Sequence, residues 1–325
     1  QLLLAGPIAG FLLLPAAFVY FPRNKMERAL KFTMVGIYTF FFISTFRGPV
    51  EVNWPVPALI PLAILSHHYL SDKIRFFKSL RVITGISLVL TVAARIYMVV
   101  DLGPDNTLKN RFHASSRWVP ELNKKTGKYP VIFTNSYQRA SQFWFYTGKP
   151  SHEMHYYMSR RTNYNLWPMD LDLLGKPVFI ATQYKSPPYN DSVYSGNEWL
   201  ALSFDSLFSP MGKISIHTEK NRYTVKQGEA LSIRIHPMLP DPYPDFLRAH
   251  PDLSTQLIIG IAEDKREIKE IETGITAHQL IARDTLSLAA DTKDLPSGKY
   301  TMRFTIRVKN YMLAHNSKKI RLIIE

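Results

Sequence analysis

The first hundred residues are apolar and nearly free of acidic side chains, and this feature constrains the fold most. They contain three acids, Glu27, Glu51 and Asp72, against ten lysines and arginines. Their apolar stretches come close to the roughly 20 residues that cross a hydrocarbon core of about 30 Å. The helices of a soluble bundle would show a polar face with a period of about 3.6 residues, and these stretches show none. The pattern predicts a membrane α-helical bundle with four spans, at residues 2–20, 29–46, 54–70 and 82–100.

The basic residues between these stretches predict the orientation of the spans. Eight lysines and arginines lie in residues 22–31 and 66–81, whereas residues 47–53 contain only Arg47. Because cytoplasmic loops carry an excess of Lys and Arg, we expect a multi-pass protein of the inner (cytoplasmic) membrane with residues 104–325 outside it. Basic residues near the membrane attract the anionic head groups of its lipids. A membrane location therefore explains part of the excess of basic residues in a chain with a formal net charge of +14. No nucleic-acid partner is needed.

Composition excludes several other classes of protein. The chain has no cysteine, so it has neither a disulfide framework nor a thiolate zinc site. The acid-poor first part argues against a fully soluble enzyme, and 46% hydrophobic residues argue against a disordered chain. The chain starts at Gln1, within an apolar run. We interpret it as the C-terminal piece of a longer membrane protein.

Residues 104–325 are polar and predict two further regions. In residues 104–209, apolar runs at 129–134 and 176–182 flank a helix-like segment at 138–146. This order predicts a small extracytoplasmic α/β unit. In residues 210–325, short apolar or alternating runs separated by Gly and Pro turns predict an immunoglobulin-like β-sandwich, with strands at 213–218, 230–236, 256–262, 300–308 and 319–324.

Two motifs resemble those of a known enzyme family. The first is Asn-Trp-Pro-x-Pro-Ala, which begins at Asn53. The second runs from Tyr137 to Trp167 and contains Ala-Ser-x-x-x-Phe-Tyr followed by Arg-x-x-Asn-Tyr-x-x-Trp. Together they resemble bacterial membrane glycosyltransferases related to protein O-mannosyltransferases and to the lipid A aminoarabinose transferase. The resemblance covers about residues 1–185 and leaves out the β-rich tail.

The resemblance implies a fold and an activity. It implies a GT-C fold, in which many membrane helices carry an outer soluble domain. Enzymes of this family transfer a sugar from a polyprenyl-phosphate carrier to a lipid, glycan or protein acceptor. Their acidic catalytic residue lies in a loop that would precede this chain, so no catalytic residue is expected here. The cofactor stays open; any divalent cation would be held by that preceding part.

The residue types of both motifs suggest where substrate could bind. In the membrane part, cations and amide or indole N–H groups near the outer surface could hold the carrier phosphate. An intramembrane arginine is also a functional candidate. In the outer part, arginines and aromatic faces suit a sugar or a phosphate, although the same aromatic residues could simply form the core. The candidates are Arg47, Asn53, Trp54, Arg95, Tyr137, Arg139, Ser141, Tyr146, Arg160, Asn163, Tyr164 and Trp167.

Other readings compete with the transferase. Four helices could merely anchor a non-enzymatic binding protein that presents a β-sandwich outside the membrane. A transporter is disfavoured because the four spans contain no acidic residue that could couple an ion. His152 and His155 have a helix-like spacing but no visible third ligand, so no metal site is predicted.

Overall fold

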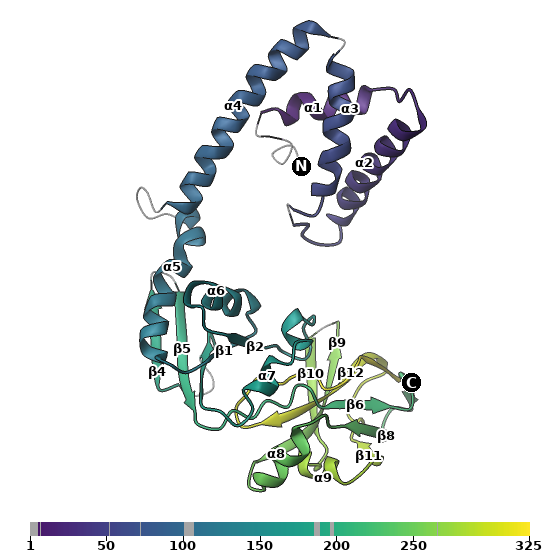
Figure 1. The fold of residues 1–325 in the computed structure, drawn as a ribbon. Coiled ribbons are helices and arrows are strands. Elements are labelled where there is room, and N and C mark those ends of the chain that lie inside the picture. Colours follow the sequence, from purple (N-terminus) through teal and green to yellow (C-terminus); the bar gives the residue numbers. More distant parts are fainter. Residues whose placement is uncertain are drawn as a thin grey trace. The chain divides into compact units, whose positions relative to one another are not determined.

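A computed structural model describes residues 6, 8–51, 53–71, 73–100, 107–184, 189–195, 198–264 and 266–325. The chain divides into two compact units, Gln1–Phe112 and His113–Glu325. The first unit is helical, whereas the second contains the sheets (Figure 1). The start of the predicted first span, residues 2–5 and 7, lies outside the described residues. So does the boundary expected at residue 103.

The N-terminal unit consists of short and long helices around a small core. Met34, Leu62 and Leu65 are fully buried there, beside Ala17 and Tyr38. Asn24 caps the second helix, because its side chain accepts a hydrogen bond from the Glu27 backbone N–H. The elements are α1 (Gly10–Val19), α2 (Lys25–Ser44), η1 (Val56–Ala58), α3 (Leu59–Ser71) and α4 (Ile74–Val99).

The predicted four-span membrane bundle is wrong. Within the described residues, one helical segment, Lys78–Val99, is long and apolar enough to cross a membrane. The ten residues of α1 rise only about 15 Å and the thirteen of α3 about 20 Å, short of the roughly 30 Å core. Helix α2 is long enough, but its first turns carry Lys25, Glu27, Arg28 and Lys31. The described chain is instead mixed α/β, with three sheets in its C-terminal unit.

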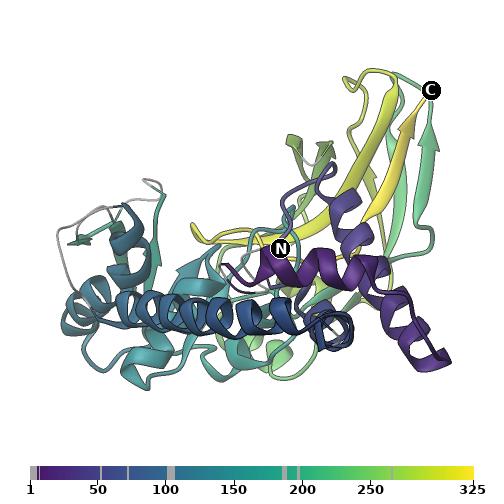
Figure 2. The same cartoon turned by 90° about the horizontal axis from the view of Figure 1, so that it is seen from above.

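Helix α4 has a long apolar surface. Figure 2 shows it as one uninterrupted helix. Its apolar side chains are exposed in the N-terminal unit, with Val82, Leu88 and Val89 each more than 60% accessible. A helix with apolar side chains on all sides is normally covered by protein or by lipid.

The C-terminal unit begins with a five-stranded mixed sheet in the order β2-β1-β3-β5-β4. The strands β2, β1 and β3 are parallel, and β5 and β4 continue the sheet in antiparallel pairing. Because α6 connects the parallel neighbours β1 and β2, the three form a β-α-β unit. The elements are α5 (Thr107–Thr126), β1 (Val131–Thr134), α6 (Tyr137–Thr147), β2 (Ser151–Met154), η2 (Asn163–Asn165), α7 (Met169–Asp172), β3 (Val178–Thr182), β4 (Asp191–Ser195) and β5 (Glu198–Asp205).

Both faces of this sheet are covered at β1, which explains why that strand is apolar from Val131 to Phe133. On one face, Trp118 and Leu122 of α5 and Phe143 of α6 pack against Phe133 of β1. On the other face, Ile132 belongs to a cluster against which Tyr311 and Met312, from the end of the chain, pack. The sheet therefore shares a core with the C-terminal β region.

The C-terminal β region contains a five-stranded sheet, β10-β9-β12-β13-β7, and a three-stranded sheet, β11-β8-β6. All neighbours pair antiparallel except β13 and β7, which are parallel. The elements are β6 (Ser215–Thr218), β7 (Arg222–Val225), β8 (Leu231–Met238), α8 (Tyr243–Ala249), β9 (Thr255–Glu263), β10 (Arg266–Glu272), α9 (Ala277–Ile281), β11 (Leu286–Ala290), β12 (Gly298–Val308) and β13 (Ile320–Ile324).

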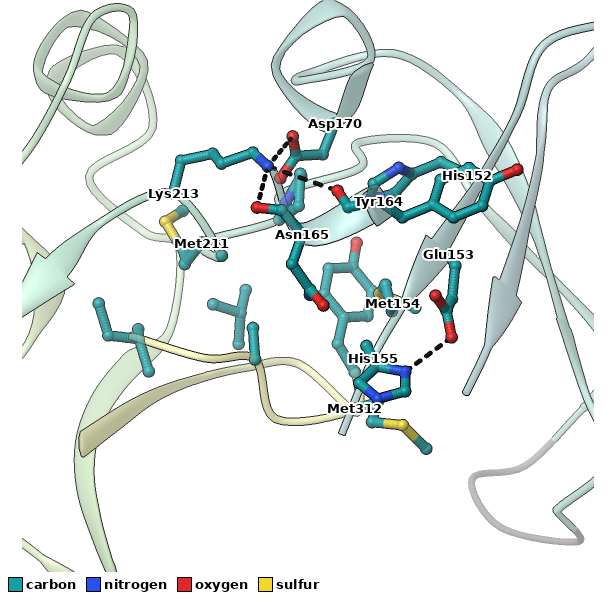
Figure 3. A pocket seen from close by; sticks show the side chains of 16 residues that line it. His152, Glu153, Met154, His155, Tyr164, Asn165, Asp170, Met211, Lys213 and Met312 are labelled. Atoms are coloured by element: carbon teal, nitrogen blue, oxygen red, sulfur yellow. Dashed lines mark hydrogen bonds and ion pairs between the residues drawn. The ribbon is translucent and has the colours of Figure 1, made fainter. Parts of the chain in front are cut away.

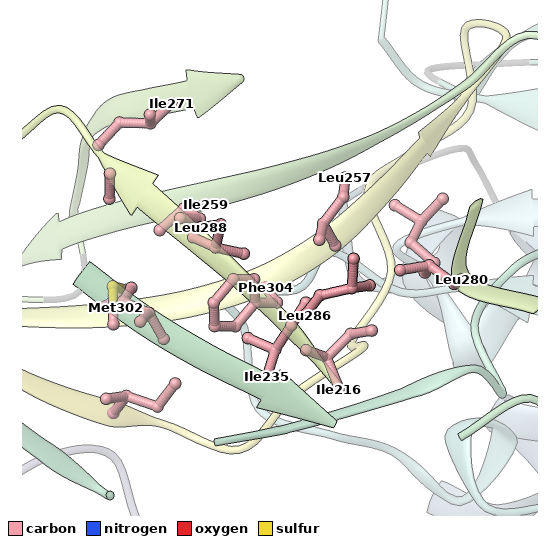
Figure 4. Packing of buried hydrophobic residues seen from close by; sticks show 14 of the residues in the cluster. Ile216, Ile235, Leu257, Ile259, Ile271, Leu280, Leu286, Leu288, Met302 and Phe304 are labelled. Carbon is pink, nitrogen blue, oxygen red and sulfur yellow. The ribbon is translucent and has the colours of Figure 1, made fainter. Parts of the chain in front are cut away.

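The core of this region lies between its two sheets (Figure 4). Ile233 and Ile235 of β8 alternate with exposed residues, and they face Ile259 and Phe304 of the larger sheet. Each fully buried side chain of this size contributes about 1.5–3 kcal/mol relative to an exposed one. The β region thus has a large hydrophobic core of its own, against which Leu171 and Leu174 from the α/β part also pack.

Candidate functional site

Residues of the second motif gather around one cavity at the carboxyl ends of β1 and β2. The cavity measures about 590 Å³ and is formed by the start of α6 and by the segment that follows β2. In open α/β sheets, ligands bind at the carboxyl ends of the strands. Six of the eight candidates from the outer part line it: Tyr137, Ser141, Arg160, Asn163, Tyr164 and Trp167.

The start of α6 supplies hydrogen-bond donors to this cavity. Asn135, with a φ of 51°, turns the chain between β1 and the helix, a conformation that Asn tolerates better than most residues. Ser136 caps the helix by accepting a hydrogen bond from the Arg139 backbone N–H at 3.4 Å. Tyr137 and Gln138 of the first turn line the cavity. Free N–H groups and the helix dipole at such a terminus favour an anion.

The segment after β2 supplies an aromatic wall. Tyr164 is 3% exposed, and its hydroxyl lies 3.1 Å from the Ser141 hydroxyl of α6. The ring of Trp167 meets that of Tyr164 edge to face, with ring centres 5.2 Å apart. Tyr164 therefore fixes the segment to the helix, and Trp167, 44% exposed, offers a face on which a sugar ring can stack.

The charge of the cavity is positive. Arg160 and Arg161 line it and are exposed, and His155 lies beside them. None of the described lining residues carries a carboxylate. An anion entering the cavity would meet two guanidinium groups and no acidic group, an arrangement suited to a phosphate.

The buried carboxylate of Glu153 contacts two side chains that line the cavity, those of Thr162 and His155. Glu153 is 1% exposed; its Oε2 accepts a hydrogen bond from Thr162 Oγ1 at 2.8 Å, and its Oε1 lies 2.7 Å from His155 Nδ1. The sequence suggested no role for Glu153. A charged residue inside a strand whose four residues are all buried is a signal that becomes visible only once β2 is identified.

A smaller pocket of about 40 Å³ shares Tyr164 with the lining of the cavity (Figure 3). Lys213 Nζ donates to the Asn165 carbonyl at 2.7 Å and lies 3.5 Å from Asp170 Oδ1. Burial raises the pKa of Asp170, and the ammonium of Lys213 opposes that shift. Burial likewise lowers the pKa of Lys213. Burial and then Lys213 lower the pKa of His152 to about 3, so that ring is neutral at physiological pH.

The segment after β2 is also attached to the β region. The Tyr157 ring lies against Gly260 of β9 so closely that a Cβ there would be 1.8 Å from its hydroxyl. That hydroxyl donates to Glu267 Oε1 at 2.6 Å, and Arg303 donates to the Tyr157 carbonyl. Burial, followed by the neighbouring Glu270 carboxylate, raises the pKa of Glu267 to about 7. The β region thus fixes the chain directly before the arginine pair.

The remaining outer candidates, Arg139 and Tyr146, do not line the cavity. The Arg139 guanidinium lies 3.4 Å from the Ser136 hydroxyl, and Tyr146 packs edge to face on Phe145 at the end of α6. Both residues therefore belong to α6 and to the motif, but neither contributes a side chain to the cavity.

The four candidates of the N-terminal unit do not form a site with one another. Arg47 and Asn53 are exposed in the connection between α2 and η1, and Trp54 packs on Phe41 with ring centres 5.9 Å apart. Arg95 is exposed on α4. None of them lines any of the five best-defined cavities in the described part of the chain.

The residues that the structure describes contain no group of three or more histidines, aspartates and glutamates that could hold a metal ion. Pairs such as Glu153 and His155 are held by other side chains of the protein. The chemistry that the cavity offers is therefore that of hydrogen-bond donors, cations and aromatic faces.

Comparisons with known proteins give little further guidance. No protein-family model matches the chain, and no curated protein matches it significantly. One similar solved structure is a chain from work on "T cell specificity and activation by the bacterial superantigen toxic shock syndrome toxin-1". It is 14% identical and covers 34% of this chain and 99% of its own length, with a TM-score of 0.22. A likeness at that level supports no conclusion about fold or function.

Proposed function

We propose that this chain binds the donor substrate of a membrane-associated glycosyltransferase that takes a sugar from a polyprenyl-phosphate carrier. The observation that supports this best is the cavity at the ends of β1 and β2, where Arg160 and Arg161 meet Tyr164 and Trp167 without a lining carboxylate. The arginines would hold the phosphate, and the exposed ring of Trp167 would stack on the sugar. The family resemblance of the same motif points to the same donor.

The proposal assigns binding and orientation to the cavity and leaves the proton transfer to another group. Transfer to an acceptor hydroxyl needs a base that removes its proton. The described lining offers no carboxylate for that task. The base would then come from the catalytic loop that the family resemblance implies.

A titration of the full chain in mild detergent tests the proposal. The ligands are a polyprenyl-phosphate-linked hexose, the free polyprenyl phosphate and the uncharged polyprenol. We expect affinity to fall in that order, with the largest loss on removal of the phosphate, because charge-assisted hydrogen bonds contribute about 1.5–3 kcal/mol each. Equal affinity for the phosphate and the polyprenol would contradict it.

A binding protein without transfer activity is the second candidate. It is favoured by the same lack of a lining carboxylate in the described cavity. In that case the titration would succeed, but a membrane-embedded form that also contains the expected catalytic loop would release no polyprenyl phosphate from the bound donor when acceptors are added. Release of the carrier phosphate therefore distinguishes the two functions.

Membrane attachment is part of the proposal and rests on α4. Its segment Lys78–Val99 is about 33 Å long and would cross the membrane with the C-terminal unit outside. The basic residues before this segment and in its first turn, Lys73, Arg75, Lys78 and Arg81, favour the cytoplasm.

Cysteines introduced at Ser71 and Ser297 test this orientation, since the chain has no cysteine of its own. In intact cells, an impermeant thiol reagent should label only the cysteine at position 297. Labelling of both positions, or of position 71 alone, would contradict the orientation. Permeabilised cells, in which both should react, provide the control.

A further inference from the structure

We propose that a basic groove along β7 and β13, at the edge of the β region that also contains β6, binds an oligosaccharide that carries several carboxylate or phosphate groups. The groove is defined by Lys220, Arg222, Lys318, Lys319 and Arg321, with Lys299 at its far end. The ligand would be the acceptor of the sugar. That role rests on the proposed function, whereas the binding of the polyanion does not.

Two neighbouring hollows make up the groove. One, of about 270 Å³, contains Lys220, Lys318 and Lys319, and the other, of about 730 Å³, contains Arg222 and Arg321. They follow one another along the chain, since Asn221 and Ile320 line the first and the next residues, Arg222 and Arg321, line the second. The side chains lie outside the core, since Arg321 is exposed while its neighbours Ile320 and Leu322 are buried.

The positive charges of the groove are concentrated and outnumber its carboxylates. Arg222 and Arg321 are direct partners in the parallel pairing of β7 and β13, and like charges in that position are destabilising. No carboxylate lines the first hollow among the described residues, and Asp264 is the one that lines the second. Neither arginine has an ion-pair partner among the described side chains. A bound polyanion would relieve this repulsion.

The groove is continuous with the candidate site. Arg161 lines both the donor cavity and the first hollow, and its guanidinium lies 3.5 Å from the Ser317 carbonyl at the edge of that hollow. An anionic chain lying along β13 would therefore reach the cavity at Arg161. This is the position that an acceptor must take to meet the donor sugar.

The other lining groups favour a sugar chain over a nucleic acid. Ser215, Thr218 and Asn221 line the first hollow and offer hydroxyl and amide groups for sugar hydroxyls. Tyr300 is the one Phe, Tyr or Trp among the described lining of the two hollows, and it is 5% exposed. Proteins that bind single-stranded nucleic acid stack successive bases on exposed aromatic rings, and the described lining offers only the imidazole of His217 for that purpose.

Binding of an oligogalacturonate and of an oligo(glycerol phosphate) to the full chain in detergent tests the inference, with a neutral maltodextrin of similar length as the reference. Wild-type protein should bind both anionic probes and not the maltodextrin. Lys319→Ser combined with Arg321→Ser should weaken that binding by about tenfold or more and reduce its salt dependence. The matched control is Arg283→Ser with Lys293→Ser, two exposed cations of the β region outside the groove.

Three outcomes would overturn the inference. These are equal binding of maltodextrin, unchanged affinity in the groove variant, and tighter binding of single-stranded DNA or of anionic lipid vesicles than of either anionic probe. The donor titration is an independent measurement on the wild-type chain. Polyanion binding without donor binding would refute the proposed function alone, and the reverse would refute this inference alone.

Discussion

Replacement of Lys213 by methionine should destabilise the C-terminal unit by about 3 kcal/mol, because removing one partner of a buried ion pair leaves the other charge uncompensated. Lys213 Nζ lies 3.5 Å from Asp170 Oδ1, and the two side chains are 15% and 5% exposed. The variant also loses the hydrogen bond to the Asn165 carbonyl. Chemical denaturation of the full chain in detergent, followed by tyrosine and tryptophan fluorescence, measures the change.

The sign of the pH dependence follows from Asp170. Burial raises its folded pKa above the ordinary value of 3.8, so the stability linked to this carboxyl is fully present below that value. It is lost as the pH rises through the folded pKa. Without Lys213 the folded pKa rises further, because the opposing cation is gone. The deficit of Lys213→Met should therefore be larger at about pH 8 than at about pH 4.

A double variant separates charge from packing. Lys213→Met combined with Asp170→Leu removes both charges, and replacement of a buried pair by apolar residues is often neutral or stabilising. It should recover most of the lost stability and show little pH dependence near neutral pH. Lys226→Met, at an exposed position of the same region, should change little. A single variant as stable as the wild type at about pH 8 would mean that the pair is not buried in solution.

Several elements could be predicted from the sequence because their apolar period is unambiguous. The apolar runs expected at 129–134 and 176–182 contain β1 and β3. The strand β2 was missed because Ser-His-Glu-Met reads as a polar loop, and it is buried only through its pairing with β1. The strand β10 was missed because five of its seven residues are charged and it lies at an edge of the sheet.

The membrane part was overpredicted because apolar composition does not fix where a helix begins and ends. The stretch at 54–70 contains a 3-10 turn before α3, which shortens the helix to thirteen residues. In the same way, α2 begins at Lys25, ahead of the apolar stretch at 29–46. Hydropathy alone could not reveal these boundaries, since turns and caps decide them.

The site was predicted in part, and helix geometry explains which candidates of α6 line the cavity and which do not. Tyr137 and Ser141 are four residues apart on α6 and so share a face, which lines the cavity. Arg139 and Tyr146 lie about 180–200° around the helix from Tyr137, so they face away. Arg161, Gln138 and Asn135 also line the cavity, and their proximity follows from the parallel pairing of β1 and β2, which a single sequence does not show.

The second large effect that we expect is a loss of donor affinity when both arginines of the donor cavity are replaced. Arg160 and Arg161 are exposed in the described structure and have no carboxylate beside them in the cavity, so their replacement should leave the fold intact. Each charge-assisted hydrogen bond to a phosphate contributes about 1.5–3 kcal/mol, and about 1.4 kcal/mol corresponds to a tenfold change in affinity. Loss of both contacts should therefore weaken donor binding by about a hundredfold.

Titration of a polyprenyl-phosphate-linked hexose into the wild-type chain and into Arg160→Gln combined with Arg161→Gln tests the central claim most directly. The control is Arg266→Gln with Arg283→Gln, two exposed arginines of the β region, and circular dichroism verifies that all three proteins are folded. We expect the control to bind the donor as the wild type does and the cavity variant to bind it about a hundredfold more weakly. A cavity variant that is folded and binds the donor with wild-type affinity would contradict the assignment of this cavity as the donor site.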